Sequence, residues 1–165
     1  ELTELPRCLG IVGAGPIGCE MAQAFARLGS QVYLIGRPHG ILPREERDAA
    51  DIVRKALEND GVRVLCCAQE LSVSNESNGI RIKVESHGKG FEVPVSHLLV
   101  AAGRTPNVEG LGLESAGVAF NHEGVRVDDH LQTTRSGIYA CGDICSRFQF
   151  THAADFMARH LEAAA

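Results

Sequence analysis

A glycine-rich turn near the start of the chain restricts the possible folds more than any other feature. Residues 13–18 read Gly-Ala-Gly-Pro-Ile-Gly; they follow an apolar run at residues 8–12 and open a stretch with helical periodicity at residues 17–28. This order of strand, turn and helix is the one that a dinucleotide-binding βαβ unit requires. The sequence therefore predicts an α/β fold whose parallel sheet begins at this turn.

Each glycine of the turn has its own expected task. Gly13 permits a tight turn, Gly15 lets the backbone approach a pyrophosphate, and Gly18 lets the helix pack close to the strand. The helix start at Pro16 and Ile17 directs unpaired N–H groups and the positive end of the helix dipole at the phosphates. We expect Gly13, Gly15, Pro16, Ile17 and Gly18 to bind the pyrophosphate of a dinucleotide. The alternative is a glycine turn with a purely structural role.

The residues after the second predicted strand indicate which nucleotide binds. Residues 31–35 are apolar almost throughout, as in a strand buried on both faces. An NAD site would carry an acidic residue shortly afterwards for the ribose 2′-hydroxyl, but this chain has Gly36 and Arg37. Arg37 offers a donor fork suited to a 2′-phosphate, and Arg44 adds a second cation. The sequence favours NADP over NAD; the alternative is a solvated Arg37 in a site that takes either cofactor loosely.

The remaining pattern predicts one full domain and part of another. A second helix and a third strand over residues 45–66 complete a βαβαβ unit with adjacent parallel strands. Period-two alternation over residues 71–95 predicts a three-stranded antiparallel meander, and residues 98–102 form a last buried strand. Beyond it the chain becomes irregular, with a small β pattern at residues 125–127 and 137–140 and a helix over residues 150–161.

Composition argues against several classes of partner. The net charge is −5 and no basic stripe is present, so nucleic acid is not expected to bind. No apolar run approaches the length of a membrane span, and the N-terminus lacks the organisation of a signal peptide. We expect a cytoplasmic protein that has no membrane partner.

Six cysteines raise the question of redox or metal chemistry. None forms a C-x-x-C pair, and no cysteine–histidine spacing resembles a zinc site, so no metal site is expected. Cys66 and Cys67 are adjacent and should point to opposite faces of a strand. Cys141 and Cys145 flank a Gly-Asp turn and are the pair most worth testing. A catalytic disulfide within this chain is the less favoured interpretation.

Three segments together resemble the pyridine nucleotide-disulfide oxidoreductase family of flavoenzymes, which includes dihydrolipoamide dehydrogenase, glutathione reductase and mercuric reductase. Residues 13–20 look like the family's nucleotide turn with its trailing glutamate. Residues 98–107 are similar to the segment where the chain leaves the NAD(P) domain, and residues 134–143 are similar to the second flavin motif. The resemblance covers nearly the whole chain, and residues 22–30 with 151–156 look most like mercuric reductase-like members.

The resemblance implies a Rossmann-like NAD(P)-binding domain at residues 6–105 and a partial FAD-binding segment at residues 106–165, with Gly103 as a cofactor-binding position at the exit. It implies an enzyme that passes hydride from NAD(P)H to FAD. The first flavin fingerprint, the redox-active cysteine pair and the dimerisation domain of the family are missing, so we expect an inactive internal fragment of a homodimeric enzyme. No catalytic residue is expected within it. The alternatives are a non-catalytic nucleotide-binding module and a disulfide-independent NAD(P)H:flavin oxidoreductase.

The same resemblance gives roles to individual residues of the flavin side. Glu20 would lie near the junction of nicotinamide and flavin, and Asp143 would hydrogen-bond the ribityl chain of the flavin. The last predicted helix would direct its N-terminus at the flavin pyrimidine edge through Thr151, His152 and Ala153. The alternatives are a solvated glutamate favoured by the helix dipole, an aspartate that only forms a turn, and a histidine that caps a helix or lies on the surface.

Overall fold

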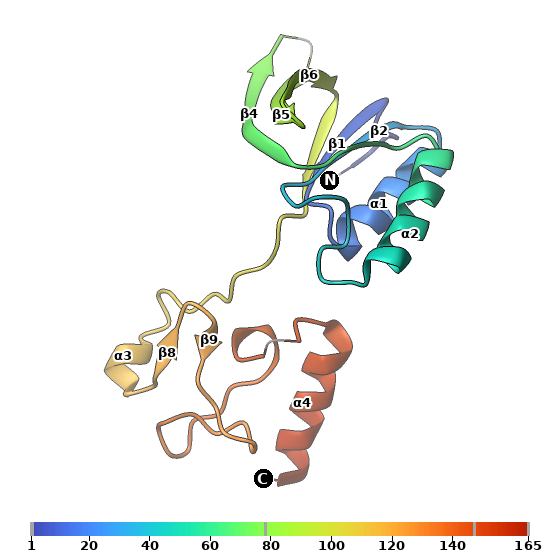
Figure 1. Cartoon of the computed structure of the whole chain (residues 1–165). Helices are drawn as coiled ribbons and strands as arrows, with labels where there is room; N and C mark the ends of the chain where they lie inside the picture. Colours follow the sequence, from blue (N-terminus) through green and yellow to red (C-terminus); the bar gives the residue numbers. More distant parts are fainter. Residues whose placement is uncertain (1, 78, 147, 165) are drawn as a thin grey trace. The chain divides into compact units, whose positions relative to one another are not determined.

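The computed structural model describes residues 2–77, 79–146 and 148–164. The chain divides into two compact units, Glu1–Gly103 and Arg104–Ala165, and each is described by itself (Figure 1). The division falls two residues before the predicted boundary at 105/106, and the functional roles of the two predicted domains stay predictions. Residue 78, inside the predicted meander, and residue 165, at the end of the second predicted domain, lie outside the described residues. In the described part of the chain, no helix is long and apolar enough to cross a bilayer.

The first unit is built on a four-stranded parallel sheet with the strand order β3-β2-β1-β7. Its strands are β1 (Cys8–Val12), β2 (Gln31–Ile35), β3 (Arg63–Leu65) and β7 (His97–Val100). Helices α1 (Pro16–Arg27) and α2 (Arg47–Asn59) connect β1 to β2 and β2 to β3. The predicted alternation of strands and helices is confirmed, with boundaries that differ by one or two residues.

Both helices cover one face of this sheet (Figure 1). Leu9 and Ile11 of β1 pack with Val32 and Leu34 of β2 in one buried cluster, which also contains Leu57 of α2. The spacing of two residues puts these strand side chains on the same face. Both helices carry apolar residues at helical spacing, and the C-cap of each is followed by a glycine with positive φ.

An antiparallel meander covers the other face (Figure 1). Its strands are β4 (Ala68–Glu76), β5 (Gly79–Ser86) and β6 (Lys89–Val95). Ile35 of β2 is buried against the meander in a second cluster with Ile82 and Val93. The meander comes so close that a Cβ on Gly10 would lie 2.5 Å from the Ile82 Cδ1 atom. Burial on both faces explains why β2 is apolar almost throughout.

The second unit is small and has little regular structure. It contains α3 (Leu113–Ala116), β8 (Phe120–Asn121), β9 (Gly124–Val125), the 3-10 turn η1 (Gly142–Ile144) and α4 (Thr151–Ala164). The predicted β pattern beyond β9 consists of two isolated bridges, between Val127 and Thr133 and between Gln132 and Tyr139. α4 confirms the predicted final helix.

Candidate nucleotide-binding site

Two glycines of the turn after β1 are required by the packing of the chain itself. Gly13 has a φ of 118°, and its N–H donates to the Ile35 carbonyl oxygen over 2.8 Å. A Cβ on Gly13 would overlap the carbonyl oxygen of Ala101, and one on Gly18 would overlap the Gly13 carbonyl oxygen. Any side chain at either position would push the turn off β7 or push α1 off the turn. These contacts agree with the tight turn and close helix packing expected from the sequence.

Gly15 is different, because nothing in the chain requires a glycine there. Its φ of −81° is open to any residue, and a Cβ on it would meet no other atom within 4 Å. Gly15 is the N-cap of α1 and provides no side-chain hydrogen bond to the first turn. The N–H groups at the start of the helix, where Pro16 occupies the first position and Ile17 is 48% exposed, are therefore left for solvent or a ligand. A ligand that approaches the backbone would explain the glycine.

The turn also lies where an open α/β sheet binds its ligands. The chain leaves β1 toward β2 on one side and later returns to β7 on the other, so β1 is the point at which the strand order reverses. The Ala101 N–H donates to the Val12 carbonyl oxygen over 2.7 Å, which holds the exit of β7 beside the turn. Gly103, with a φ of 121°, follows as the last residue of the first unit.

The loop after β2 folds back onto the same turn. A Cβ on Gly36 would lie 2.7 Å from the Ala14 Cβ, and the Leu42 N–H donates to the Ala14 carbonyl oxygen over 2.8 Å. Arg37 directly follows Gly36, and Arg44 comes two residues after Leu42. Both arginine side chains are exposed. The guanidinium groups of Arg37 and Arg44 make no ion pair or hydrogen bond with any residue that the structure describes. Two uncommitted cations are thus carried by a loop that is fixed to the glycine turn.

The remaining predicted residue of the first unit, Glu20, is exposed on α1. It lies beyond the first turn of the helix, which contains no acidic residue. Burial, together with the negative charge of Glu20, raises the pKa of the neighbouring Cys19 thiol to about 11. Cys19 is accordingly a small buried hydrophobic residue at neutral pH.

In the second unit, Asp143 lies in η1 at the edge of a cavity of about 380 Å³. Arg104 Nη1 lies 3.5 Å from Asp143 Oδ2 and donates to the Gln149 carbonyl oxygen over 2.7 Å. Both charged side chains are about half exposed. The Asp143 carboxylate is therefore only weakly engaged by the protein and can accept hydrogen bonds from a polar ligand.

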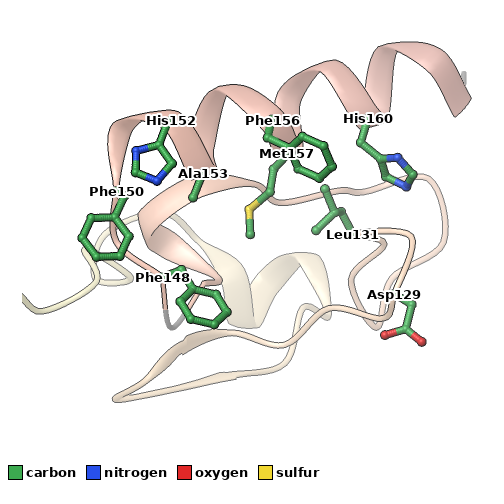
Figure 2. Close-up of a pocket in the computed structure, with 9 residues that line it drawn as sticks. All are labelled: Asp129, Leu131, Phe148, Phe150, His152, Ala153, Phe156, Met157 and His160. Carbon is green, nitrogen blue, oxygen red and sulfur yellow. The ribbon is translucent and has the colours of Figure 1, made fainter. Parts of the chain in front are cut away.

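A larger cavity of about 780 Å³ lies beside α4 (Figure 2). Its lining is mostly aromatic and apolar and consists of Asp129, Leu131, Phe148, Phe150, His152, Ala153, Phe156, Met157 and His160. The His152 ring stacks on Phe150 with 5.3 Å between centroids. Thr151 begins the helix beside it, and the Gly142 N–H donates to the sulfur of Met157. Gly142, which precedes Asp143, thus packs against α4, and a Cβ on it would lie 3.2 Å from the Ala154 Cβ.

In the cysteine pair of the second unit, the Cys145 thiol is held in its neutral form. Cys141 and Cys145 are both free, and the Cys145 thiol donates to the Ala140 carbonyl oxygen over 3.2 Å. Burial, and then the charge of Cys141, raise the pKa of the Cys145 thiol above its ordinary value. A thiol with a raised pKa is a poor nucleophile at neutral pH.

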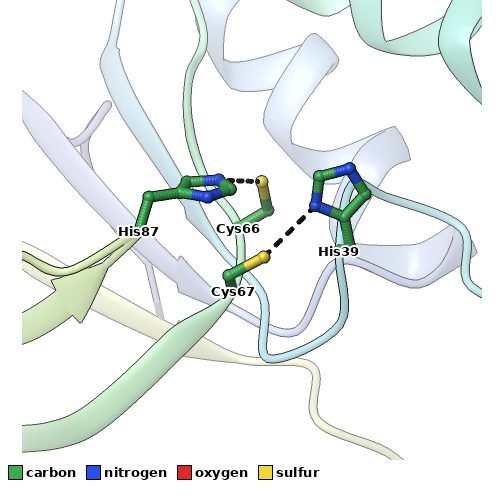
Figure 3. Close-up of side chains that lie close together, drawn as sticks. All are labelled: His39, Cys66, Cys67 and His87. Atoms are coloured by element: carbon green, nitrogen blue, oxygen red, sulfur yellow. Dashed lines mark hydrogen bonds between the residues drawn. The ribbon is translucent and has the colours of Figure 1, made fainter.

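One cluster of reactive side chains was missed by the sequence argument. His39, Cys66, Cys67 and His87 each offer a ligand atom, and these four atoms all lie within 4.8 Å of one another (Figure 3). The prediction that Cys66 and Cys67 point to opposite faces of a strand is wrong, because β3 ends at Leu65 and Cys67 has a φ of 55°. The partners are 28 and 21 residues apart in sequence, so no local spacing could have found them.

Comparison with known proteins places this geometry in a family. A sequence model described as pyridine nucleotide-disulphide oxidoreductase matches residues 1–158. The chain belongs to this family.

Individual relatives agree with the assignment. The chain is 42% identical over 154 residues to a dihydrolipoyl dehydrogenase of Bacillus subtilis, covering 93% of this chain and 33% of that protein. It is 34% identical over 157 residues to a mercuric reductase of Bacillus cereus, covering 94% and 25%. The Cu(II) complex of the HOCl-induced flavoprotein disulfide reductase RclA from Escherichia coli superposes with a TM-score of 0.88 at 36% identity, covering 99% of this chain and 37% of that one. The chain spans between a quarter and somewhat more than a third of the length of these relatives.

Proposed function

We propose that the first unit binds the pyrophosphate of NAD(P)H over Gly15 and the first turn of α1, as the nucleotide-binding portion of a flavin-dependent oxidoreductase. The observation that carries the proposal is the open space above Gly15, at the point of the sheet where the strand order reverses. Membership of a family described by pyridine nucleotides, and relatives named as oxidoreductases, support it.

The loop after β2 supports a preference for NADPH within that proposal. The 2′-phosphate of NADPH adds charge that the exposed Arg37 and Arg44 can neutralise, and an arginine fork matches phosphate geometry. The Gly36–Ala14 contact and the Leu42–Ala14 hydrogen bond hold both ends of the loop, so little loop order has to be gained on binding.

The residues of this chain would bind and orient the cofactors. When bound, nicotinamide and flavin supply the hydride chemistry. The Ile17 and Gly18 N–H groups would hold the pyrophosphate, Glu20 would lie toward the nicotinamide, and Asp143 would accept a hydrogen bond from a hydroxyl of FAD. The start of α4, with Thr151, His152 and Ala153, would stabilise negative charge on the flavin through the helix dipole.

Further parts of the proposal concern the intact protein. We infer that the intact protein is a homodimeric, cytoplasmic enzyme. This chain alone should be inactive, because the relatives are about three or more times as long. The free state of all six cysteines fits a reducing compartment.

Nucleotide titration of the 165-residue chain by calorimetry tests both levels of the proposal. We expect NADPH to bind more tightly than NADH, and Arg37→Ala to weaken NADPH about tenfold while leaving NADH nearly unchanged. Arg7→Ala is the matched control, because it removes the same charge next to the other end of β1. Equal binding of both nucleotides would remove the NADP preference, and no binding of either would overturn the nucleotide function itself.

A further inference from the structure

We propose that His39, Cys66, Cys67 and His87 form a binding site for a single Zn²⁺ ion. The four side chains come from the loop after β2, the junction of β3 and β4, and the turn between β5 and β6 (Figure 3). The site stands on its own contacts and does not depend on the proposed nucleotide function.

The distances among the ligand atoms fit one tetrahedral ion. Cys67 Sγ lies 3.3 Å from His39 Nδ1, and Cys66 Sγ lies 3.2 Å from His87 Nε2. Zinc bonds of about 2.3 Å to sulfur and about 2.0 Å to nitrogen place such atoms about 3.6 Å apart around a tetrahedral ion. The longest separation among the four atoms is below 4.8 Å, so small side-chain rotations are sufficient to bring all four to one centre.

Hydrogen bonds to backbone carbonyl oxygens hold the segments together. The Cys67 N–H donates to the Pro38 carbonyl oxygen over 3.0 Å, which fixes the loop that carries His39. The Ser86 hydroxyl donates to the Cys66 carbonyl oxygen over 2.6 Å, directly before His87. Each cysteine is thus joined by a hydrogen bond to the segment that supplies its histidine, Cys67 through its backbone N–H and Cys66 through its carbonyl oxygen. The cluster is pre-organised by the fold.

The backbone conformation of Cys67 brings its thiol into the cluster. Its positive φ of 55° is uncommon for a residue other than glycine, asparagine, aspartate or histidine. His87 also has a positive φ, but it is followed by Gly88 in a tight hairpin turn that favours this geometry. At Cys67 the unusual backbone turns the thiol to the same side as that of Cys66. Such backbone strain is found preferentially at functional sites.

The donor set selects the ion. Two thiolates with two imidazoles in a tetrahedron are typical of Zn²⁺, and the oxygen ligands preferred by Mg²⁺ and Ca²⁺ are missing from the cluster. On binding, both thiols release their protons to solvent and both imidazoles bind in the neutral form. Two thiolates then balance the charge of the ion. His39 and His87 are exposed, so the ion can enter from solvent.

Zinc titration of the reduced, metal-free 165-residue chain against a chromophoric chelator tests the proposal. We expect one Zn²⁺ per chain, and Co²⁺ in its place should give thiolate charge-transfer absorption and the intense visible bands of a tetrahedral ion. Zn²⁺ should also protect Cys66 and Cys67 of the unaltered chain from alkylation, as read by peptide mass spectrometry. Cys141 and Cys145 should react equally with and without Zn²⁺, and a chelator should restore the reactivity of the first pair.

Variants then assign the ligands. Two double variants should each lose the stoichiometric site: Cys66→Ser/Cys67→Ser and His39→Asn/His87→Asn. The histidine variant has the sequence Asn-Gly at positions 87 and 88, which favours the observed hairpin turn. Cys141→Ser/Cys145→Ser, which removes the same number of thiols from the second unit, should bind one Zn²⁺ as before. Zinc binding that survives both cluster variants, or that disappears in the control, overturns the proposal. So does equal alkylation of Cys66 and Cys67 of the unaltered chain with and without Zn²⁺.

Discussion

The Gly15→Asn substitution separates the role of Gly15 in ligand binding from any role in folding. The backbone at Gly15 has an ordinary φ of −81°, and an added Cβ meets nothing within 4 Å, so the substitution introduces no clash. Asparagine is also preferred over glycine at a helix N-cap by a few tenths of a kcal/mol. The free energy of unfolding should therefore stay within about 0.5 kcal/mol of the original.

Nucleotide binding should respond in the opposite way. The asparagine side chain fills the open space, and its oxygen competes for the N–H groups of the first turn of α1 that we assign to the pyrophosphate. Loss of one charge-assisted hydrogen bond costs about 1.5–3 kcal/mol, which corresponds to a decrease in NADPH affinity of roughly ten- to one-hundred-and-fifty-fold.

Calorimetric titration with NADPH, paired with urea unfolding, measures both quantities on the same protein. Gly90→Asn is the matched control, because Gly90 also has open space around its Cα and lies in the exposed part of β6. It should leave both binding and stability nearly unchanged. Unaltered NADPH affinity in Gly15→Asn, with the fold intact, would refute the assignment of the open space to a ligand.

Three further outcomes are expected. Gly13→Ala should lower the free energy of unfolding by about 2 kcal/mol or more in urea, because it combines a φ of 118° with overlap of the Ala101 carbonyl oxygen; a loss below 0.5 kcal/mol would contradict this. The double change Arg37→Ala/Arg44→Ala should make the affinities for NADPH and NADH equal. A remaining preference for NADPH would show that other residues select the cofactor. Burial that raises the pKa of Cys19 from 9.0 to about 11 favours the neutral thiol in the folded chain, so its contribution is present below pH 9 and is lost as the pH rises to about 11. Between pH 9 and pH 11, the free energy of unfolding of the original chain should fall by up to about 2 kcal/mol more than that of Cys19→Ala. The same pH dependence in both proteins would contradict the buried, neutral state of this thiol.

Much of the first unit could be predicted because its elements follow from local patterns. The run at residues 8–12 becomes β1 without a change of boundary, and the apolar run of β2 correctly indicated a strand covered on both faces. The period-two segments were sufficient to predict the meander. Gly13 and Gly18 were correctly tied to close backbone contacts, since a glycine turn between strand and helix has few geometries.

The cluster of two cysteines and two histidines could not be predicted in the same way. It depends on where β3 ends and on the φ of Cys67, and both are decided by contacts with distant segments, such as the hydrogen bond to Pro38. In the second unit the predicted β segments contained Val127 and Tyr139 but not their bridge partners Thr133 and Gln132, because each bridge joins single residues across an irregular turn. A vicinal cysteine pair at a strand end, with a histidine in the following hairpin, is the one signal that the sequence offered.

The most direct test of the central claim is to map NADPH binding on the isotope-labelled chain by two-dimensional NMR. The account predicts that NADPH shifts the backbone amide signals of Gly15, Ile17 and Gly18 most strongly, followed by those of the loop that carries Arg37. Signals of the meander turn at Gly88 should change little. Binding whose largest shifts lie outside the glycine turn and this loop would contradict the account.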